Sequence, residues 1–516
     1  MDYSKMTLRE KVLQTFVVTI REINTHGGPA AFFEKYPVGG LYYSYQADTV
    51  GTTEMGTGTN PARLAECRAA SRLPLFVCAD GVAFPGQTVG APTTSAAATR
   101  DIESAYRLGR ICGMQMNEAD IDWVLTPMVD LLYNREMPLY ACTDDPALCA
   151  AINRAFVQGV QAEGVCATIK HFPGIGTCNI NMHFGPGRND LPFDEWMESY
   201  GLVYRTCIKA GVMSVMTTHM TLRSYDDAGE RGYYPIATYS KKLTTDLLKG
   251  ELGFGGAVVT DALIMGGMAT GDLIEETVQA FRAGADFLLW PPVEAADRIV
   301  ELLESGEIPM SRLEDALARI ESMRAFREEG KRTPHPTSLE YVEQNSRAIL
   351  RDGICLLRNR LGLIPLDPAA ARRMLIVDAS DSGTAAANLQ KALGERGVAA
   401  DVKRMIYDVP SRVCWQADFD ALAADYDCII FAVDTDYVTS WSVPYMLIWA
   451  SHLFDKKKKI IVNYGSPFFA DSYFPEDPTY IETNAPGSPY CAECVADILL
   501  GRAEATGKHI LLHPHL

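Results

Sequence analysis

The sequence predicts an α/β protein: a TIM-like (β/α)8 barrel followed by a smaller α/β sandwich domain. Short apolar, β-branched runs alternate with helical patterns over the first two thirds of the chain, and a second alternation follows a change in composition. Continuous apolar runs between helices are typical of parallel strands buried on both faces. Seven or eight such units in about 330 residues favour a barrel over an open sheet.

Each expected strand of the barrel is a short apolar run. These runs are residues 38–44, 73–80, 121–130, 166–172, 212–220, 256–265 and 285–291. Segments between them, such as residues 104–120, repeat apolar residues at steps of three and four, which indicates amphipathic helices.

The boundary between the domains is predicted from residues 311–338, which are charged and end in GKRTPHPTS. Two prolines in such a segment favour a linker. We therefore expect the barrel over residues 1–335, a linker or domain start over 336–350 and the sandwich over 351–516. The strands expected in the second domain are residues 353–359, 372–380, 398–405, 427–436 and 456–465, the last opening with a lysine run interpreted as solvated.

Charge and composition restrict the partners. The chain has 516 residues, 47% of them hydrophobic, and 47 Lys and Arg against 65 Asp and Glu give a net charge of −18. An acidic surplus repels phosphate backbones and anionic lipids, so we expect a small neutral ligand and neither nucleic acid nor membrane as partner. Charged residues from Asp2 to Lys11 interrupt any apolar N-terminal segment, so we expect a cytoplasmic protein.

The 13 cysteines are scattered, mostly in apolar stretches, and are expected to be reduced and buried. Cys491 and Cys494 have C-x-x-C spacing, but without a second pair they favour a helix start over a metal or redox site. We expect no metal and no cofactor.

Polar residues stand where several predicted strands end. They are Asp80, Lys170 with His171, Thr218 with His219, and Thr260 with Asp261. Singly, each has an ordinary explanation, since aspartates cap turns and histidines are found in cores. Together at the C-terminal mouth of a barrel, they form the carboxylate and hydroxyl-binding set of a sugar site.

The motifs around these residues resemble glycoside hydrolase family 3, and within it the bacterial β-N-acetylglucosaminidase branch. The resemblance rests on KHFPGIGTCNINMHFGPG (170–187) and GAVVTDALIMGGM (256–268). It extends to TPMVDLLYNREMP (126–138), DGICLLRN (352–359) and VNYGSPFFADSYFPEDP (462–478).

The resemblance implies a role for each matching residue. Asp261 matches the nucleophile of a retaining mechanism, which forms a glycosyl-enzyme intermediate. Asp80, Lys170 and His171 match the residues that bind sugar hydroxyls, and we add His219 to this set. His183 matches the histidine that serves as general acid/base, a role suited to a group that titrates near neutral pH. Gly174, Gly176 and Gly185 would let its loop fold over the sugar.

The acid/base loop departs from the family pattern at the residue beside the histidine. This branch usually reads G-H-G-D-T-x-x-D-S-H, whereas Asn181 stands here in place of the last aspartate. Asparagine can accept a hydrogen bond from His183 but supplies no negative charge to stabilise an imidazolium. We therefore expect a more acidic pH optimum or a slower enzyme.

A second departure concerns the sugar-binding arginine of the branch, which aligns with Tyr140. Ile175 also replaces a histidine. A phenol in place of a guanidinium changes which sugar substituents the pocket can hold, although Arg135 could compensate.

The sequence thus predicts a retaining, exo-acting β-N-acetylhexosaminidase. Two alternatives lie within the family: a β-glucosidase whose acid/base is Glu482 or Glu476, and a phosphorolytic enzyme, since a histidine repels phosphate less than a carboxylate does. A third is a sugar-binding protein that has lost catalysis. The oligomeric state stays open.

Overall fold

The computed structural model describes most of the chain in two compact units. The described residues are 1–43, 61–80, 91–133, 141–178, 180–228, 234–268, 271–332, 338–367, 373–380, 383–404, 421–434 and 455–512. Unit 1 comprises residues 1–87, 109–131 and 153–338, and unit 2 comprises 88–108, 132–152 and 339–516.

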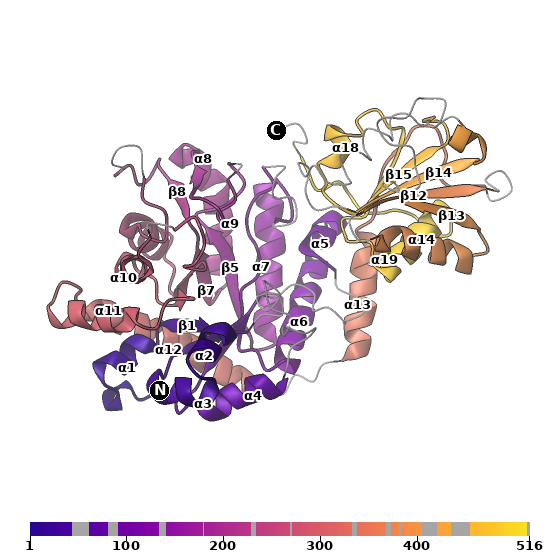
Figure 1. The fold of residues 1–516 in the computed structure, drawn as a ribbon. Coiled ribbons are helices and arrows are strands. Elements are labelled where there is room, and N and C mark those ends of the chain that lie inside the picture. Colours follow the sequence, from indigo (N-terminus) through magenta and orange to yellow (C-terminus); the bar gives the residue numbers. More distant parts are fainter. Residues whose placement is uncertain are drawn as a thin grey trace. The chain divides into compact units, whose positions relative to one another are not determined.

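Unit 1 contains an eight-stranded parallel sheet in the order β10-β1-β2-β3-β4-β5-β7-β9 (Figure 1). The strands are β1 (Phe16–Thr19), β2 (Gly40–Tyr42), β3 (Phe76–Ala79), β4 (Trp123–Val124), β5 (Cys166–Phe172), β7 (Ser214–Thr217), β9 (Ala257–Thr260) and β10 (Leu288–Leu289). A parallel bridge between Val259 and Phe287 joins β9 to the start of β10. The ring is thereby almost closed, which confirms the predicted barrel.

Helices connect these strands along the chain. They are α1 (Leu8–Leu13), α2 (Ile20–Thr25), α3 (Pro29–Lys35), α4 (Pro61–Ala70), α6 (Ile102–Glu118), α7 (Pro146–Ala162), α8 (Phe193–Glu198), α9 (Tyr200–Lys209), η2 (Lys242–Glu251), α10 (Leu273–Ala283), α11 (Ala295–Glu304) and α12 (Met310–Arg332), after the short η1 (Tyr3–Lys5). A small sheet pairs β6 (Gly187–Asn189) with β8 (Met220–Leu222). Local sequence signals define helix starts. At the start of α1, for example, Thr7 and Glu10 form a capping box.

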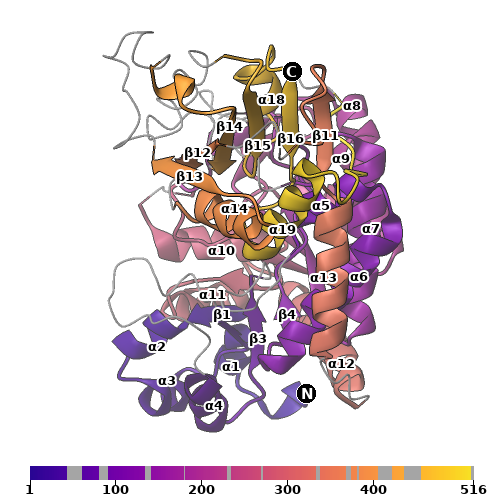
Figure 2. The same ribbon diagram turned by 90° about the vertical axis from the view of Figure 1, so that its right-hand side faces the viewer.

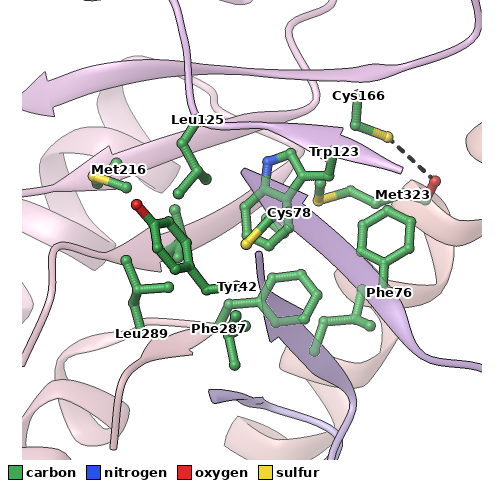
Figure 3. Packing of buried hydrophobic residues seen from close by; sticks show 14 of the residues in the cluster. Tyr42, Phe76, Cys78, Trp123, Leu125, Cys166, Met216, Phe287, Leu289 and Met323 are labelled. Atoms are coloured by element: carbon green, nitrogen blue, oxygen red, sulfur yellow. Dashed lines mark hydrogen bonds between the residues drawn. The ribbon is translucent and has the colours of Figure 1, made fainter. Parts of the chain in front are cut away.

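Large side chains from neighbouring strands fill the barrel (Figure 3). The rings of Phe76 and Phe287 stack with centroids 6.3 Å apart, and Trp123 lies 4.9 Å from Phe287. The buried indole of Trp123 donates to Thr168 Oγ1. This packed interior holds the strands that carry the site at their C-terminal ends.

Residues 311–332 are not a linker, contrary to the sequence prediction. They form most of α12, which buries Leu313, Ile320 and Met323. Met323 packs with the barrel core, and its carbonyl accepts from Cys166 Sγ. Most charges of this segment lie on the other faces of the helix, while Arg324 and Arg327 are buried with the apolar residues. Composition alone therefore indicated the wrong structure.

Unit 2 contains a six-stranded sheet in the order β11-β16-β15-β14-β12-β13, parallel except for the β11–β16 pair (Figure 2). Its strands are β11 (Cys355–Asn359), β12 (Met374–Ser380), β13 (Ala400–Arg404), β14 (Cys428–Asp434), β15 (Lys459–Asn463) and β16 (Thr479–Glu482). Its helices include α5 (Thr93–Thr99), α13 (Leu339–Asp352), α14 (Thr384–Glu395), α18 (Phe469–Ser472) and α19 (Pro489–Leu499). The predicted second α/β layer is therefore present.

Two predictions for unit 2 have different outcomes. Cys491 and Cys494 lie at the start of α19, as expected. Lys459, by contrast, is not solvated: its side chain is fully buried, and Nζ lies 2.6 Å from Asp477 Oδ1. No helix in the described ranges is long and apolar enough to span a membrane.

Candidate active site

The first group of polar side chains at the C-terminal ends of the barrel strands is centred on Asp80. It follows β3, and its Oδ1 accepts from Lys170 Nζ of β5 at 2.6 Å. Its Oδ2 accepts from the Tyr42 hydroxyl at 2.6 Å. The side chain of Lys170 is 10% exposed and that of Asp80 is 40% exposed, so the carboxylate is open to a ligand. This pair can both accept from and donate to sugar hydroxyls.

His171 is held by a carboxylate that the sequence analysis missed. Asp130 Oδ2 lies 2.8 Å from His171 Nδ1, and its Oδ1 accepts from the backbone N–H groups of His171 and Ile175. Asp130 is 2% exposed. A bond through Nδ1 leaves Nε2 of His171 for another partner. Asp130 ends an expected strand, as Asp80 does, so the same signal could have found it.

Asp261 directly follows β9 and is positioned by two hydrogen bonds. Ala262 N donates to its Oδ1 and Thr218 Oγ1 to its Oδ2, both at 2.9 Å. Burial by itself would raise the pKa of Asp261, but the positive potential of His171 and His219 and these hydrogen bonds outweigh it. The pKa of Asp261 therefore lies below its ordinary value, which favours the ionised carboxylate.

His219, which the sequence places among the substrate-binding residues, is buried, and its substrate contact stays a prediction. Its side chain is fully buried, with Nδ1 2.9 Å from Thr238 Oγ1 and Nε2 3.0 Å from the Ala262 carbonyl. Both ring nitrogens are thus used within the protein. His219 instead holds the segment that follows Asp261.

His183 and Asn181 lie together on an exposed loop after β5. His183 Nδ1 is 2.7 Å from Asn181 Oδ1, and the same oxygen accepts from His183 N at 3.0 Å. The amide oxygen can only accept, so Nδ1 carries the hydrogen and Nε2 is the atom free to exchange a proton. The predicted pairing of Asn181 with the histidine is present in the structure.

The start of this loop is anchored rather than free to fold. Gly174 and Gly176 have φ values of 112° and 123°, and a Cβ on Gly174 would lie 2.1 Å from Tyr200 Cδ1. The Tyr200 hydroxyl donates to the Ile175 carbonyl, and Trp196 Nε1 donates to the Pro173 carbonyl. Ile175 is 3% exposed, so it packs in the interior instead of replacing a sugar contact. Gly174 and Gly176 thus allow close packing against their neighbours, and the predicted closure of the loop over a sugar stays a prediction.

Tyr140 and Arg135 lie outside the described residues, so their predicted contacts stay predictions. Glu482 is fully buried in β16, and His509 Nδ1 lies 3.1 Å from both of its carboxylate oxygens. Burial lowers the pKa of His509, but Glu482 outweighs it and raises the pKa above the ordinary value. Both oxygens of the buried Glu482 carboxylate are thus directed at His509 and not at a substrate, whereas Glu476 is exposed.

Within the ranges that the structure describes, no group of His, Cys, Asp and Glu side chains is arranged to hold a metal ion. The chemistry available at the barrel mouth is that of a carboxylate, an imidazole and a set of hydroxyl-binding groups.

Comparisons with known proteins are consistent with this arrangement. The Cellulomonas fimi protein named beta-N-acetylglucosaminidase/beta-glucosidase is 28% identical over 346 residues, which cover 63% of this chain and 61% of that protein. The chain thus spans about three fifths of the length of this relative.

Two solved structures share the fold over nearly the whole chain. A beta-glucoside phosphorylase, BglX bound to 2FGlc, has a TM-score of 0.81 at 22% identity and covers 98% of this chain and 94% of its own. A family 3 beta-N-acetylglucosaminidase from Paenibacillus sp. str. FPU-7 has a TM-score of 0.80 at 23% identity and covers 98% and 99%.

The model of the glycosyl hydrolase family 3 N-terminal domain matches residues 7–323. This match covers more than half of the chain and includes every strand of the barrel. The chain belongs to glycosyl hydrolase family 3.

Proposed function

We propose that the protein is a retaining, exo-acting β-glycosidase that hydrolyses non-reducing terminal β-N-acetylglucosaminides. Asp261 is the nucleophile and His183 the general acid/base. Asp80, Lys170 and His171 bind the hydroxyls of the terminal sugar.

The observation that carries the proposal is the placement of His183 beside the strand end that bears Asp261. Gly266 N, in the segment after Asp261, donates to the His183 carbonyl at 2.9 Å. A histidine on this loop can therefore supply the proton that the second-unit carboxylates would supply in a β-glucosidase. The burial of Glu482 against His509 argues further against that alternative.

The mechanism follows from the two groups. Asp261 attacks the anomeric carbon while the bond to the leaving oxygen breaks and the His183 imidazolium donates its Nε2 proton to that oxygen. The resulting imidazole then takes a proton from water, whose oxygen attacks the anomeric carbon and releases Asp261. Two displacements at one carbon give net retention.

The N-acetylglucosamine preference is supported by the names of the relatives. The Paenibacillus structure is named as a β-N-acetylglucosaminidase, and the Cellulomonas fimi relative is named as a β-N-acetylglucosaminidase/β-glucosidase. The histidine acid/base with its polar partner on the loop after β5 supports the same branch.

Trapping of the intermediate tests the proposal. Incubation with a 2-fluoro glycosyl probe that carries an activated leaving group should add one glycosyl group to the intact mass, with the label on Asp261. The Asp261→Asn variant is the control and should stay unlabelled. Ligand-induced thermal stabilisation of the native protein without labelling or turnover would instead indicate a sugar-binding protein that has lost catalysis.

Specificity is tested with p-nitrophenyl β-N-acetylglucosaminide and β-glucoside. We expect a higher kcat/KM for the first. The reverse order would favour the β-glucosidase alternative, and its Glu482 and Glu476 variants should then lose activity.

Phosphorolysis is a second candidate, because Asn181 leaves the His183 pair without a carboxylate that would repel phosphate, and a structure of the same fold is named as a β-glucoside phosphorylase. Adding inorganic phosphate decides between the reactions. Accumulation of a sugar 1-phosphate indicates phosphorolysis, and free sugar at an unchanged rate indicates hydrolysis.

We also propose that the protein acts in the cytoplasm. All described cysteines except Cys178 are buried, and those in the described ranges are free thiols, which suits a reducing compartment. Cell fractionation of a fluorescent fusion would test the proposed cytoplasmic location.

A further inference from the structure

The loop that carries His183 (residues 181–185, the His183 loop) packs against two consecutive glycines that follow Asp261. We call these glycines, Gly266 and Gly267, the seat of the loop. Gly266 N donates to the His183 carbonyl and Gly267 N donates to the Met182 carbonyl, both at 2.9 Å. Backbone groups thus join the loop directly to the segment that follows Asp261.

The seat has no room for a side chain. A Cβ on Gly266 would lie 2.8 Å from the His183 carbonyl oxygen and 2.9 Å from that of Phe184. A Cβ on Gly267 would lie 2.7 Å from His219 Cβ and 2.8 Å from the Met182 carbonyl oxygen. Neither glycine has a positive φ, so the close approach of the loop, not the backbone conformation, requires glycine here.

The rest of the loop leaves the position of His183 dependent on this seat. Met182 is 2% exposed and fixes one side, and Gly187 N donates to the His219 carbonyl at 2.9 Å beyond the loop. His183 and Phe184 are exposed, and within the described ranges the hydrogen bond of the His183 ring is to Asn181 of the same loop. Among these residues, the hydrogen bond that ties His183 to the segment after Asp261 is made by its backbone carbonyl.

We propose that Gly266 and Gly267 are positioning residues, whose missing side chains set the distance between the acid/base His183 and the nucleophile Asp261. The inference rests on the proposed function, because it takes His183 as the proton donor. A displacement of about 1 Å in a catalytic group can cost about 100-fold in rate.

The Gly266→Ala variant tests the role with the least risk to folding. The atoms that the added methyl meets are backbone atoms of His183 and Phe184, two exposed residues, so the substitution has to displace the loop and does not press on the barrel core. We expect kcat/KM for a disaccharide substrate, whose leaving group needs a proton, to fall by about 10- to 100-fold. Labelling of Asp261 by a 2-fluoro probe with a dinitrophenolate leaving group needs no proton and should change by less than about 3-fold.

A double-mutant cycle separates positioning from a general structural effect. In the His183→Ala background, Gly266→Ala should cause no further loss on the disaccharide, because the group that it displaces is already absent. Gly255→Ala is the matched control: Gly255 is exposed, has no positive φ, and a Cβ there would meet nothing within 4 Å. It should retain native rates in both assays.

Three results would overturn the proposal: native disaccharide turnover in Gly266→Ala, a parallel fall of labelling and turnover, or additive losses in the cycle. A failure of the proposed function would look different, since the native protein would then not be labelled at Asp261 at all. Gly267→Ala, which meets the buried His219 as well, should lose at least as much activity and also some thermal stability.

Discussion

His183 and Asn181 form a hydrogen-bonded pair that carries no negative charge. The bond of 2.7 Å fixes the ring and its tautomer, as a carboxylate partner would. The charge is what differs, because an amide does not stabilise the imidazolium formed when the ring takes a proton from water. Asn181 therefore fixes the orientation of the His183 ring but supplies no negative charge beside it, whereas a carboxylate would do both.

The Asn181→Asp variant tests this separation. The carboxylate would accept the same bond and favour the imidazolium, so the basic limb of the kcat–pH profile should move upward by about 1 pH unit. Asn181→Ala, which removes the bond, should lower kcat across the whole profile. Identical profiles for the native protein and Asn181→Asp would contradict the argument.

Asp261 should stay ionised in acid. Because its pKa lies below the ordinary value, labelling by an activated 2-fluoro probe should keep its rate as the pH falls to about 4. Thr218→Val removes a bond to the ionised form, so the acidic limb should move upward by about 1 pH unit. Thr217→Val is the control, because the Thr217 hydroxyl donates to the Val259 carbonyl and the substitution keeps the backbone bond from Asp261 N to the Thr217 carbonyl. It should leave the limb in place.

At the scale of elements, the connection after β4 organises the connection after β5. Asp130 holds His171 and, through Ile175 N, the turn that leads to the His183 loop. One carboxylate thus positions both His171 and the start of the loop that carries His183.

The Asp130→Asn variant measures this coordination. An amide cannot accept from both the ring of His171 and the two backbone N–H groups as the carboxylate does, so the His171 ring should lose its fixed orientation. We expect KM for the aryl glycoside to rise by about 10-fold, with a smaller effect on kcat. A fall in kcat with an unchanged KM would show instead that Asp130 does not act through sugar binding.

At the level of the whole molecule, a buried carboxylate at the N-terminal end of β4, opposite the strand ends that carry the site, pairs with several cations. Asp122 directly precedes β4 and lies within 3.2 Å of Arg68, Arg327 and Lys331. It also accepts from Val77 N at 3.0 Å. Burial by itself would raise the pKa of Asp122, but Arg68 and Lys331 outweigh it and hold the pKa below its ordinary value.

Asp122→Asn should lower the free energy of unfolding at pH 7 by about 3 kcal/mol, measured by urea denaturation. A depressed carboxyl pKa stabilises the fold above the ordinary titration range, and this contribution is lost as the pH falls through the folded-state value. The difference between native protein and variant should therefore shrink in acid. Asp120→Asn, whose carboxylate pairs with Arg68 while 55% exposed, is the control and should cost less than about 1 kcal/mol.

Most of the strands could be predicted because buried parallel strands are continuous apolar runs. β1 was missed because FVVT follows the α1 helical pattern with almost no break, and β16 because TYIE lies between prolines and polar residues. The segment of α12 resembles a linker in composition because its apolar residues are spaced among many charges. In each case the partners that bury the segment come from distant parts of the chain. The domain boundaries at 335 and 351 stay predictions.

The sequence by itself determined the residue types of the site and the strand ends that carry Asp80, Lys170, His171 and Asp261, because strand periodicity and local motifs are written in consecutive residues. Only the tertiary structure decided that His219 is a buried support, that Asp130 holds His171, and that Gly266 seats the His183 loop. These roles depend on burial and on distances between segments far apart in the chain, which no local pattern records.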